Sequence, residues 1–195
     1  MSLKNSKKRL ILTKGKLKTI AGPMYAGKTS ALLQEILWIK HCNNNVIVLK
    51  PEIDNRYSAT HIETHNRLSF PCFSMRDWKH VLDTYTLKPY NFHTVFLDEV
   101  QFMDTTETLA NVSRMLADGV NVIAAGLNQD SRGNPFETTA MLMALSDEIK
   151  LIQAICTCCG RPASKTQRME DSGDRVAVGS IGMYEPRCLD HWTSK

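Results

Sequence analysis

The sequence predicts an α/β fold in which helices cover both faces of a parallel β-sheet. A small C-terminal lobe that a metal ion stabilises is expected to follow. Continuous apolar runs alternate with amphipathic stretches over the first 150 residues, and a glycine-rich turn joins the first run to the first amphipathic stretch. Four of the 6 cysteines fall in the last forty residues. Apolar runs rich in β-branched residues are typical of parallel strands that helices bury on both faces.

Short apolar runs that stop at turn or charged residues predict buried strands. These strands are expected at residues 17–21, 46–49, 94–97 and 120–125. Lys50 and Pro51 close the second strand, and the polar residues 52–67 show no period, which predicts a loop.

Apolar residues spaced three or four apart predict the helices. These helices are expected at residues 28–41, 75–85, 105–118 and 138–145. The third helix is expected to be capped by Thr105 or Thr106 and to stop before Gly119, because hydroxyl residues favour helix starts and glycine favours helix ends.

Composition limits the classes of function. A chain of 195 residues holds one full α/β domain and a small appendage. A hydrophobic fraction of 43% can form a core, and a net charge of +4 is too small for an arm built mainly to neutralise nucleic-acid phosphates. No apolar run approaches the roughly 18 residues of a membrane span, and the basic first residues lack the apolar segment of a secretory signal. We therefore expect a cytoplasmic protein with no nucleic-acid or membrane partner.

Residues 22–29 match the phosphate-loop pattern G-x-x-x-x-G-K-[ST] without departure, between a predicted strand and a predicted helix. Backbone N–H groups of such a loop curl around the β-phosphate at the positive end of the following helix. In this pattern Lys28 reaches the β- and γ-phosphates and the Thr29 hydroxyl binds Mg²⁺. The sequence therefore predicts a P-loop NTPase sheet. Its candidate nucleotide-binding residues are Gly22, Pro23, Met24, Tyr25, Ala26, Gly27, Lys28 and Thr29.

Two adjacent carboxylates follow the strand at 94–97. Asp98 stands at the carboxyl end of that strand, where open α/β sheets bind ligands, and is expected to hold the Mg²⁺ shell. Glu99 can act as a general base if its carboxylate points at the acceptor. The alternative is that Glu99 is a solvated loop charge.

The C-terminal segment carries two metal-knuckle patterns, C-x-x-C and C-x-x-H. Together they supply the four donors of a closed structural zinc site, namely Cys156, Cys159, Cys188 and His191. Gly160 allows the chain to turn after the first knuckle. Buried free thiols beside a surface histidine are the alternative, and Cys158 is expected to be a spare thiol.

A metal would also stabilise a segment that is too short to bury a core of its own. We therefore expect a nucleotide-binding kinase domain at residues 15–150 and a zinc-binding lobe at residues 151–195.

Taken together, these motifs resemble the zinc-containing thymidine kinases over most of the chain. Residues 22–29 resemble the family's G-P-M-[FY]-[SA]-G-K-[ST], residues 96–102 its hydrophobic-D-E-x-Q-F, and residues 50–57 its K-P-x-x-D-x-R-Y. Tyr184, four residues before Cys188, matches the family's zinc end.

The resemblance implies a RecA-like sheet, a zinc-ribbon-like lobe, and ATP-dependent phosphorylation of the thymidine 5′-hydroxyl. The products would be thymidine monophosphate and ADP, in the pyrimidine deoxynucleoside salvage that supplies DNA precursors. It also implies Mg²⁺ with ATP, a structural Zn²⁺, and a homotetramer inhibited by thymidine triphosphate.

The resemblance further implies a role for each matching residue. Glu99 stands where the family's base takes the 5′-hydroxyl proton. Outside the phosphate loop, the residues expected to contact the nucleotide and Mg²⁺ are Asp54, Arg56, Asp98 and Gln101. The walls of the thymine pocket fall to Met24, Phe102, Leu127 and Tyr184, with Phe136 compensating for Ser131 where the family often has an aromatic residue. The resemblance also implies a lasso loop whose backbone hydrogen-bonds the base, formed by Val176, Ala177, Val178 and Gly179.

Two other readings stay open on the sequence alone. A P-loop ATPase of another kind, such as a motor or a switch, shares the phosphate loop, although the guanine signature N-K-x-D is absent from the sequence. A zinc-ribbon nucleic-acid module fused to an ATPase would need a basic footprint, and the charges from Gly160 to Arg187 nearly balance.

Overall fold

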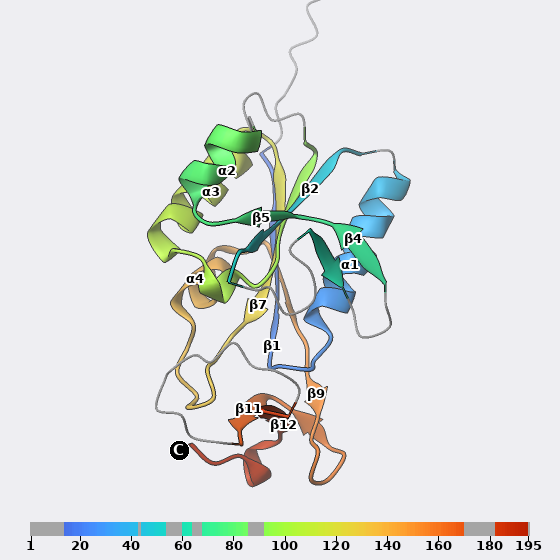
Figure 1. Ribbon diagram of the computed structural model, residues 1–195, viewed down its shortest axis with the longest axis vertical. Helices are drawn as coiled ribbons and strands as arrows, with labels where there is room; N and C mark the ends of the chain where they lie inside the picture. The colour runs from blue at the N-terminus through green and yellow to red at the C-terminus, as the bar shows by residue number, and fades with distance from the viewer. Residues whose placement is uncertain are drawn as a thin grey trace, which may run out of the picture.

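The computed structural model describes residues 14–42, 44–53, 60–63, 68–85, 92–169 and 182–194. In this part of the chain a twisted central sheet carries helices on both faces, and a small lobe lies beyond one edge of the sheet (Figure 1). None of the helices in these ranges has the length and apolarity needed to cross a membrane.

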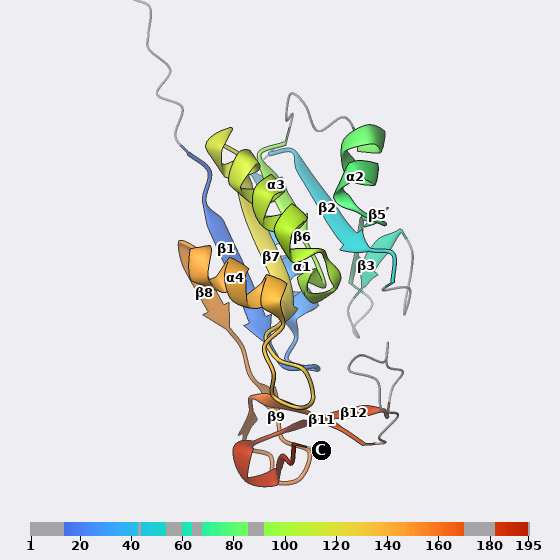
Figure 2. The same cartoon turned by 90° about the vertical axis from the view of Figure 1, so that its left-hand side faces the viewer.

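The central sheet has six strands in the described residues, and each pair of neighbours runs parallel. Their spatial order is β5 (Phe73–Met75), β2 (Val46–Pro51), β6 (Thr94–Leu97), β7 (Asn121–Leu127), β1 (Leu17–Gly22) and β8 (Glu148–Leu151). Because all these strands point the same way, their carboxyl ends lie together at the end of the sheet that faces the lobe (Figures 1 and 2). This arrangement confirms the predicted α/β fold of the P-loop class.

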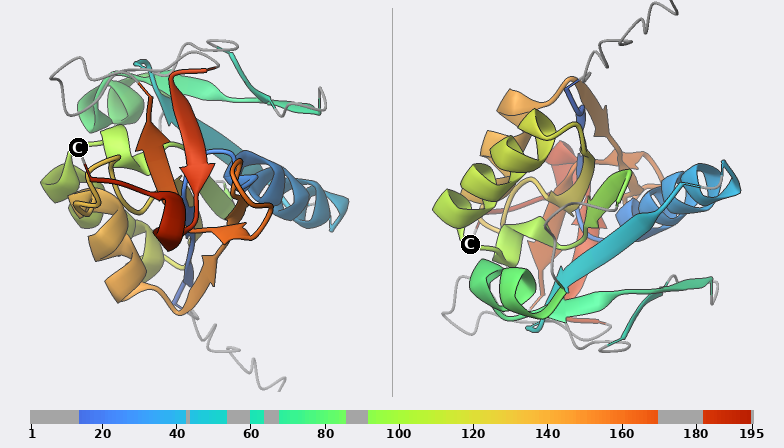
Figure 3. Two further views of the ribbon diagram at one scale, coloured as in Figure 1. Left: turned by 90° about the horizontal axis from the view of Figure 1, so that it is seen from below. Right: turned by 90° about the horizontal axis from the view of Figure 1, so that it is seen from above.

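Helices cover the two faces of the sheet, as the view from above shows (Figure 3). One face carries α1 (Lys28–His41), and the other carries α2 (Trp78–Tyr85), α3 (Thr105–Ala117) and α4 (Glu137–Leu145). Side chains along a strand alternate between the faces. In β6, for example, Phe96 packs with the α1 residues, whereas Val95 and Leu97 pack with the opposite helices. Both faces are therefore buried, as continuous apolar strands predict.

An antiparallel pair, β3 (His61–Glu63) and β4 (Ser69–Pro71), packs beside α1. Ile62 belongs to the core cluster of α1, and the Lys40 ammonium lies 5.4 Å from the centre of the Phe70 ring. The expectation that all of 52–67 forms a loop was therefore wrong. Three-residue strands flanked by polar residues are too short to show an alternation.

The helix expected at 75–85 begins instead at Trp78. Met75 ends β5, where it pairs with Pro51, and the Asp77 carboxylate accepts the N–H of His80 at 2.6 Å at the start of the helix. Met75 and Trp78 both enter the same core cluster, so their spacing of three suggested a helical turn that is absent there.

Asp104, and not Thr105 or Thr106, caps α3. The Asp104 carboxylate accepts the N–H of Glu107 at 2.8 Å, and Thr105 is the first helical residue. The Thr105 hydroxyl instead lies 2.7 Å from the Thr138 hydroxyl at the start of α4. Beyond these corrections, β8 adds a strand that the sequence did not predict, because its short, largely exposed run Glu148–Leu151 mixes charged and apolar residues.

Short strands and one helical turn form the lobe in the described residues. Two antiparallel pairs join β9 (Ala154–Ile155) to β10 (Pro162–Ala163) and β11 (Lys165–Arg168) to β12 (Tyr184–Arg187), and η2 (Leu189–His191) follows. The buried apolar cluster within this lobe consists of Ala154, Cys156, Ala163 and Cys188. Such small side chains bury little apolar surface, so this core alone stabilises the lobe weakly.

Candidate active site and metal centre

The phosphate loop lies between the end of β1 and the start of α1, at the edge of the sheet that faces the lobe. Tyr25 and Gly27 have positive φ angles of 63° and 82°, which turn the chain sharply before the helix begins. Gly22 is required by a close approach, because an added Cβ would lie 2.3 Å from the carbonyl oxygen of Ile152. The loop thus has the strand, turn and helix context that its motif requires.

Lys28 is the first residue of α1 and is only 9% exposed. Its ammonium donates a hydrogen bond of 2.9 Å to the carbonyl oxygen of Pro23, at the other end of the loop. The cation therefore lies across the loop, next to the backbone that a phosphate would approach.

The adjacent carboxylates follow β6, which β7 separates from β1. Asp98 is 4% exposed, and its N–H donates to the carbonyl oxygen of Leu49 at 2.9 Å. Its own carboxylate accepts the N–H of Glu99 at 3.0 Å. Glu99 has a left-handed φ of 51° and begins the short turn η1 (Val100–Phe102). This backbone turns the chain abruptly between the two acids.

Gln101 connects Glu99 to the neighbouring strand. Its amide nitrogen donates to the Glu99 carboxylate, and its amide oxygen accepts the N–H of Leu127 at 3.0 Å. Gly126 leaves room for this bridge, because an added Cβ would lie 2.9 Å from the amide oxygen of Gln101. The sequence associated Gln101 with the nucleotide, whereas its hydrogen bonds in the structure orient Glu99.

The pocket residues expected from the sequence come from separate segments. Leu127 pairs with Gly22 in the β1–β7 register, so the β7–α4 loop (residues 128–136) starts beside the phosphate loop. Phe136 is buried at the end of that loop, and Phe102 is half-buried at the end of η1. Tyr184 is buried in β12, with the Arg168 guanidinium 5.8 Å from its ring centre.

The lobe contacts the phosphate loop through Met24, whose N–H donates to the Thr166 hydroxyl at 3.0 Å. Sequence reasoning missed Thr166, because a lone threonine in a short strand carries no local signal. The remaining expected site residues fall outside the described residues: Asp54, Arg56, Val176, Ala177, Val178 and Gly179.

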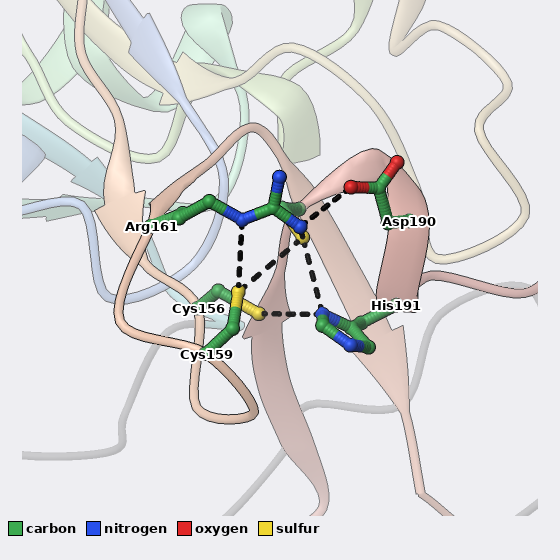
Figure 4. A network of polar contacts seen from close by, with 6 residues as sticks. Cys156, Cys159, Arg161, Asp190 and His191 are labelled. Carbon is green, nitrogen blue, oxygen red and sulfur yellow. Dashed lines mark hydrogen bonds and ion pairs between the residues drawn. The ribbon is translucent and has the colours of Figure 1, made fainter.

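The knuckle residues converge in the lobe (Figure 4). Among the described residues, the donor atoms of Cys156, Cys159, Cys188 and His191 all lie within 4.8 Å of one another. The Cys159 and Cys188 sulfurs are 3.8 Å apart, and His191 Nδ1 lies 3.3 Å from the Cys188 sulfur. Zinc bonds of about 2.3 Å to sulfur and about 2.0 Å to nitrogen place tetrahedral ligands about 3.5 to 3.8 Å apart. The cluster therefore fits a zinc ion.

Comparisons with known proteins agree with this combination of sites. The family model described as thymidine kinase matches residues 15–192. A curated thymidine kinase from Pyrobaculum aerophilum is 38% identical over 182 residues, which cover 90% of this chain and 97% of that protein. The chain belongs to the thymidine kinase family. The resemblance seen in the sequence is thus confirmed, and the chain is an enzyme that phosphorylates thymidine.

The electrostatics of the cluster favour the thiolate forms of Cys156 and Cys159, and the thiolate is the form of cysteine that binds metals. Burial opposes ionisation of Cys156, but the backbone N–H groups of Cys188, Cys158 and Cys159 outweigh it and lower the pKa of Cys156 to about 5. The Arg161 guanidinium lowers the pKa of Cys159, whereas burial raises the pKa of Cys188. The neighbouring thiolates of Cys156 and Cys159 raise the pKa of His191.

Arg161 also connects the two knuckles (Figure 4). Its Nε donates to the Cys159 sulfur at 3.4 Å, and its Nη2 donates to the Cys188 sulfur at 3.8 Å and to the Asp190 carboxylate at 2.5 Å. Cys158 is exposed and does not belong to the group of donors found among the described residues, as expected of a spare thiol.

Proposed function

We propose that this thymidine kinase transfers the γ-phosphoryl group of ATP to the thymidine 5′-hydroxyl, giving thymidine monophosphate and ADP. The step belongs to pyrimidine deoxynucleoside salvage and supplies DNA precursors. One observation carries the proposal: the phosphate loop and the Asp98–Glu99 pair lie at the same edge of a parallel sheet, one strand apart. A donor phosphate on the loop and an acceptor hydroxyl beside Glu99 can meet there.

The phosphate loop would hold the donor nucleotide. Its N–H groups would bind the β-phosphate, and Lys28 would exchange its contact with the Pro23 carbonyl for the β- and γ-phosphates. Arg56 would face the same phosphates. Phosphoryl transfer depends mostly on positioning and charge neutralisation, which these groups supply.

Oxygen donors suited to Mg²⁺ adjoin the phosphate site. A buried carboxylate and a hydroxyl are hard ligands of the kind Mg²⁺ prefers, and Asp98 is nearly inaccessible to water. Thr29, Asp98 and Asp54 would hold the ion. When bound with ATP, Mg²⁺ would neutralise charge on the phosphate oxygens.

Glu99 would be the general base. Gln101 fixes one oxygen of the Glu99 carboxylate, and the left-handed backbone at Glu99 separates this side chain from the buried Asp98. Glu99 is half-buried, so it can receive a proton from an acceptor entering the site. Asp98 and Glu99 therefore divide metal binding and proton transfer between them.

Thymidine would bind between the sheet edge and the lobe. The thymine walls would be Met24, Phe102, Leu127, Phe136 and Tyr184, and the base would be hydrogen-bonded by the backbone of Val176, Ala177, Val178 and Gly179. The lasso segment joins β11 to β12, so the lobe would position it.

A structural Zn²⁺ held by Cys156, Cys159, Cys188 and His191 would stabilise the lobe, whose own core is small. The kinase domain would then cover residues 15–150 and the zinc-binding lobe residues 151–195. Reduced cysteines are required for this site, which is consistent with a cytoplasmic location.

We also propose that the enzyme is a homotetramer and that thymidine triphosphate inhibits it. β8 is an edge strand of the described sheet and exposes Ile149 and Leu151, and the neighbouring α4 exposes Met141 and Leu145. An exposed strand edge with apolar neighbours is a surface that a second copy of the chain can cover. Thymidine triphosphate would occupy the base pocket and the phosphate site together.

The test is phosphate transfer from γ-labelled ATP across a panel of nucleosides, with Mg²⁺ present. We expect label in thymidine monophosphate and little transfer to purine nucleosides. ATP turnover that ignores nucleosides, or that nucleic acid stimulates, would overturn the proposed reaction.

A further inference from the structure

We propose that Trp192 is a positioning residue for thymidine binding. With Lys165, it holds the zinc lobe against the β7–α4 loop and so positions that loop, which contributes Phe136 to the wall of the proposed thymine pocket. The inference rests on the proposed function, and it extends that function to a residue with no predicted role.

Trp192 bridges the lobe and the loop directly. Its indole N–H donates a hydrogen bond of 3.1 Å to the carbonyl oxygen of Ser131. Its ring also lies against Gly133, where an added Cβ would come within 3.0 Å of a ring carbon. Gly133 has a φ of +85°, so glycine meets both the backbone and the space requirements of this contact.

Lys165 adds a second pair of contacts between the same two segments. Its ammonium lies 4.8 Å from the centre of the Trp192 ring, within the range of a cation–π interaction, and donates to the Gln129 side chain at 2.7 Å. Lys165 begins β11, so both bridging side chains come from the lobe and both contact the β7–α4 loop. Figure 2 shows the segment between β7 and α4 extending down to the lobe.

The loop that they hold is a preformed unit. Asp130 is buried, and its carboxylate accepts the N–H groups of Arg132 at 3.0 Å and Asn134 at 2.8 Å. Phe136 donates its N–H to the carbonyl oxygen of Asn128 at 3.1 Å, which closes the base of the loop. A contact at its tip therefore positions the whole loop, including Phe136.

The metal site fixes the other end of the bridge. Trp192 directly follows His191, the last proposed zinc ligand, and the next residue, Thr193, donates its N–H to the Gln167 side chain of β11 at 2.8 Å. The backbone is thus held on both sides of Trp192. Zinc binding at His191 then affects the β7–α4 loop through the adjacent Trp192 side chain, and Lys165 adds a second contact to the same loop.

Trp192→Phe is the test, because it keeps an aromatic ring but removes the N–H that binds Ser131. A lost neutral hydrogen bond of this kind corresponds to about a 2- to 10-fold change in an equilibrium constant. We expect the thymidine KM to rise by about that factor, with the ATP KM and the zinc content unchanged. Backbone amides of residues 130–134 should exchange hydrogen faster by a similar factor.

Trp38→Phe is the matched control, since Trp38 is 69% exposed on α1. It should change none of these quantities. Lys165→Met should act in the same direction as Trp192→Phe, and the double variant should show less than the sum of the two effects.

The proposal would be overturned if Trp192→Phe kept both the thymidine KM and the loop exchange rates of the wild type. An equal rise in the thymidine KM and the ATP KM would also overturn it. If the wild-type enzyme does not transfer phosphate from ATP to thymidine, the proposed function fails, whereas loop exchange still tests the bridge.

Discussion

At the scale of single residues, the candidate active site depends on how two neighbouring carboxylates are kept apart. Asp98 directly follows the buried strand β6 and is held by backbone contacts, whereas Glu99 turns the chain away in a left-handed conformation. A non-glycine residue rarely adopts this conformation, and strained backbone tends to cluster at functional sites. Gln101 holds Glu99 in place from the next turn.

Glu99→Gln should separate proton transfer from nucleotide binding. The amide keeps the size of the side chain but cannot accept the 5′-hydroxyl proton, so turnover should fall by about 10²- to 10⁴-fold. The affinity for Mg²⁺–ATP, measured by calorimetry, should stay close to that of the wild type. A collapse of that affinity would instead place Glu99 in the metal shell.

Arg161→Met should weaken zinc retention. The guanidinium donates to two thiol sulfurs and to Asp190, and removing such outer contacts typically lowers metal affinity by about 10- to 100-fold. Arg161→Lys keeps the charge but not the forked geometry, so its zinc affinity should lie between those of the wild type and of Arg161→Met. Competition with a chromogenic chelator measures the affinity, and unchanged zinc release from Arg161→Met would contradict the expectation.

Residues in motifs could be predicted from the sequence, because their chemistry requires fixed residue types at fixed spacing. The four knuckle residues and the phosphate loop are of this kind. Thr166, Lys165 and Trp192 could not be predicted, since their contacts join segments that are far apart in the chain.

At the scale of elements, the sequence predicted those strands and helices whose burial is continuous. It missed β5, β8 and the β3–β4 pair, which are short or half-exposed and therefore lack a clear period. Helix starts were the other source of error, since several polar residues at the start of α3 could serve as the cap and only tertiary contacts decide among them. Thr105 bonds to Thr138, which leaves Asp104 as the cap.

Asp104→Ala tests this assignment. Removing the cap carboxylate leaves the Glu107 N–H without that partner and should lower the free energy of unfolding by about 1 kcal/mol. Thr106→Ala is the control, because Thr106 is exposed and lies inside the helix, and it should change the same free energy by less than about 0.5 kcal/mol. Urea unfolding followed by circular dichroism distinguishes the two. A larger loss for Thr106→Ala would return the cap to the threonines.

At the scale of the whole molecule, the sheet and the lobe meet where the substrates are proposed to bind. The lobe touches the phosphate loop through Thr166 and the β7–α4 loop through Lys165 and Trp192. The lobe itself has a core of a few small side chains, two of them proposed metal ligands. We therefore expect the geometry of the lobe to depend on the proposed metal far more than the geometry of the sheet does.

Cys188→Ser tests this dependence across the molecule. Cys188 lies at the centre of the cluster, within 3.8 Å of Cys159 and 3.3 Å of His191, so its loss should release zinc from the purified enzyme. The sheet has its own two-sided core and should stay folded, which far-ultraviolet circular dichroism measures. Because the loosened lobe adjoins the proposed lasso segment and contacts the β7–α4 loop, the thymidine KM should rise more than the ATP KM. Cys158→Ser, at an exposed thiol outside the cluster, should change neither zinc content nor KM. Zinc loss without a change in thymidine KM would leave the metal site standing but would separate the lobe from substrate binding.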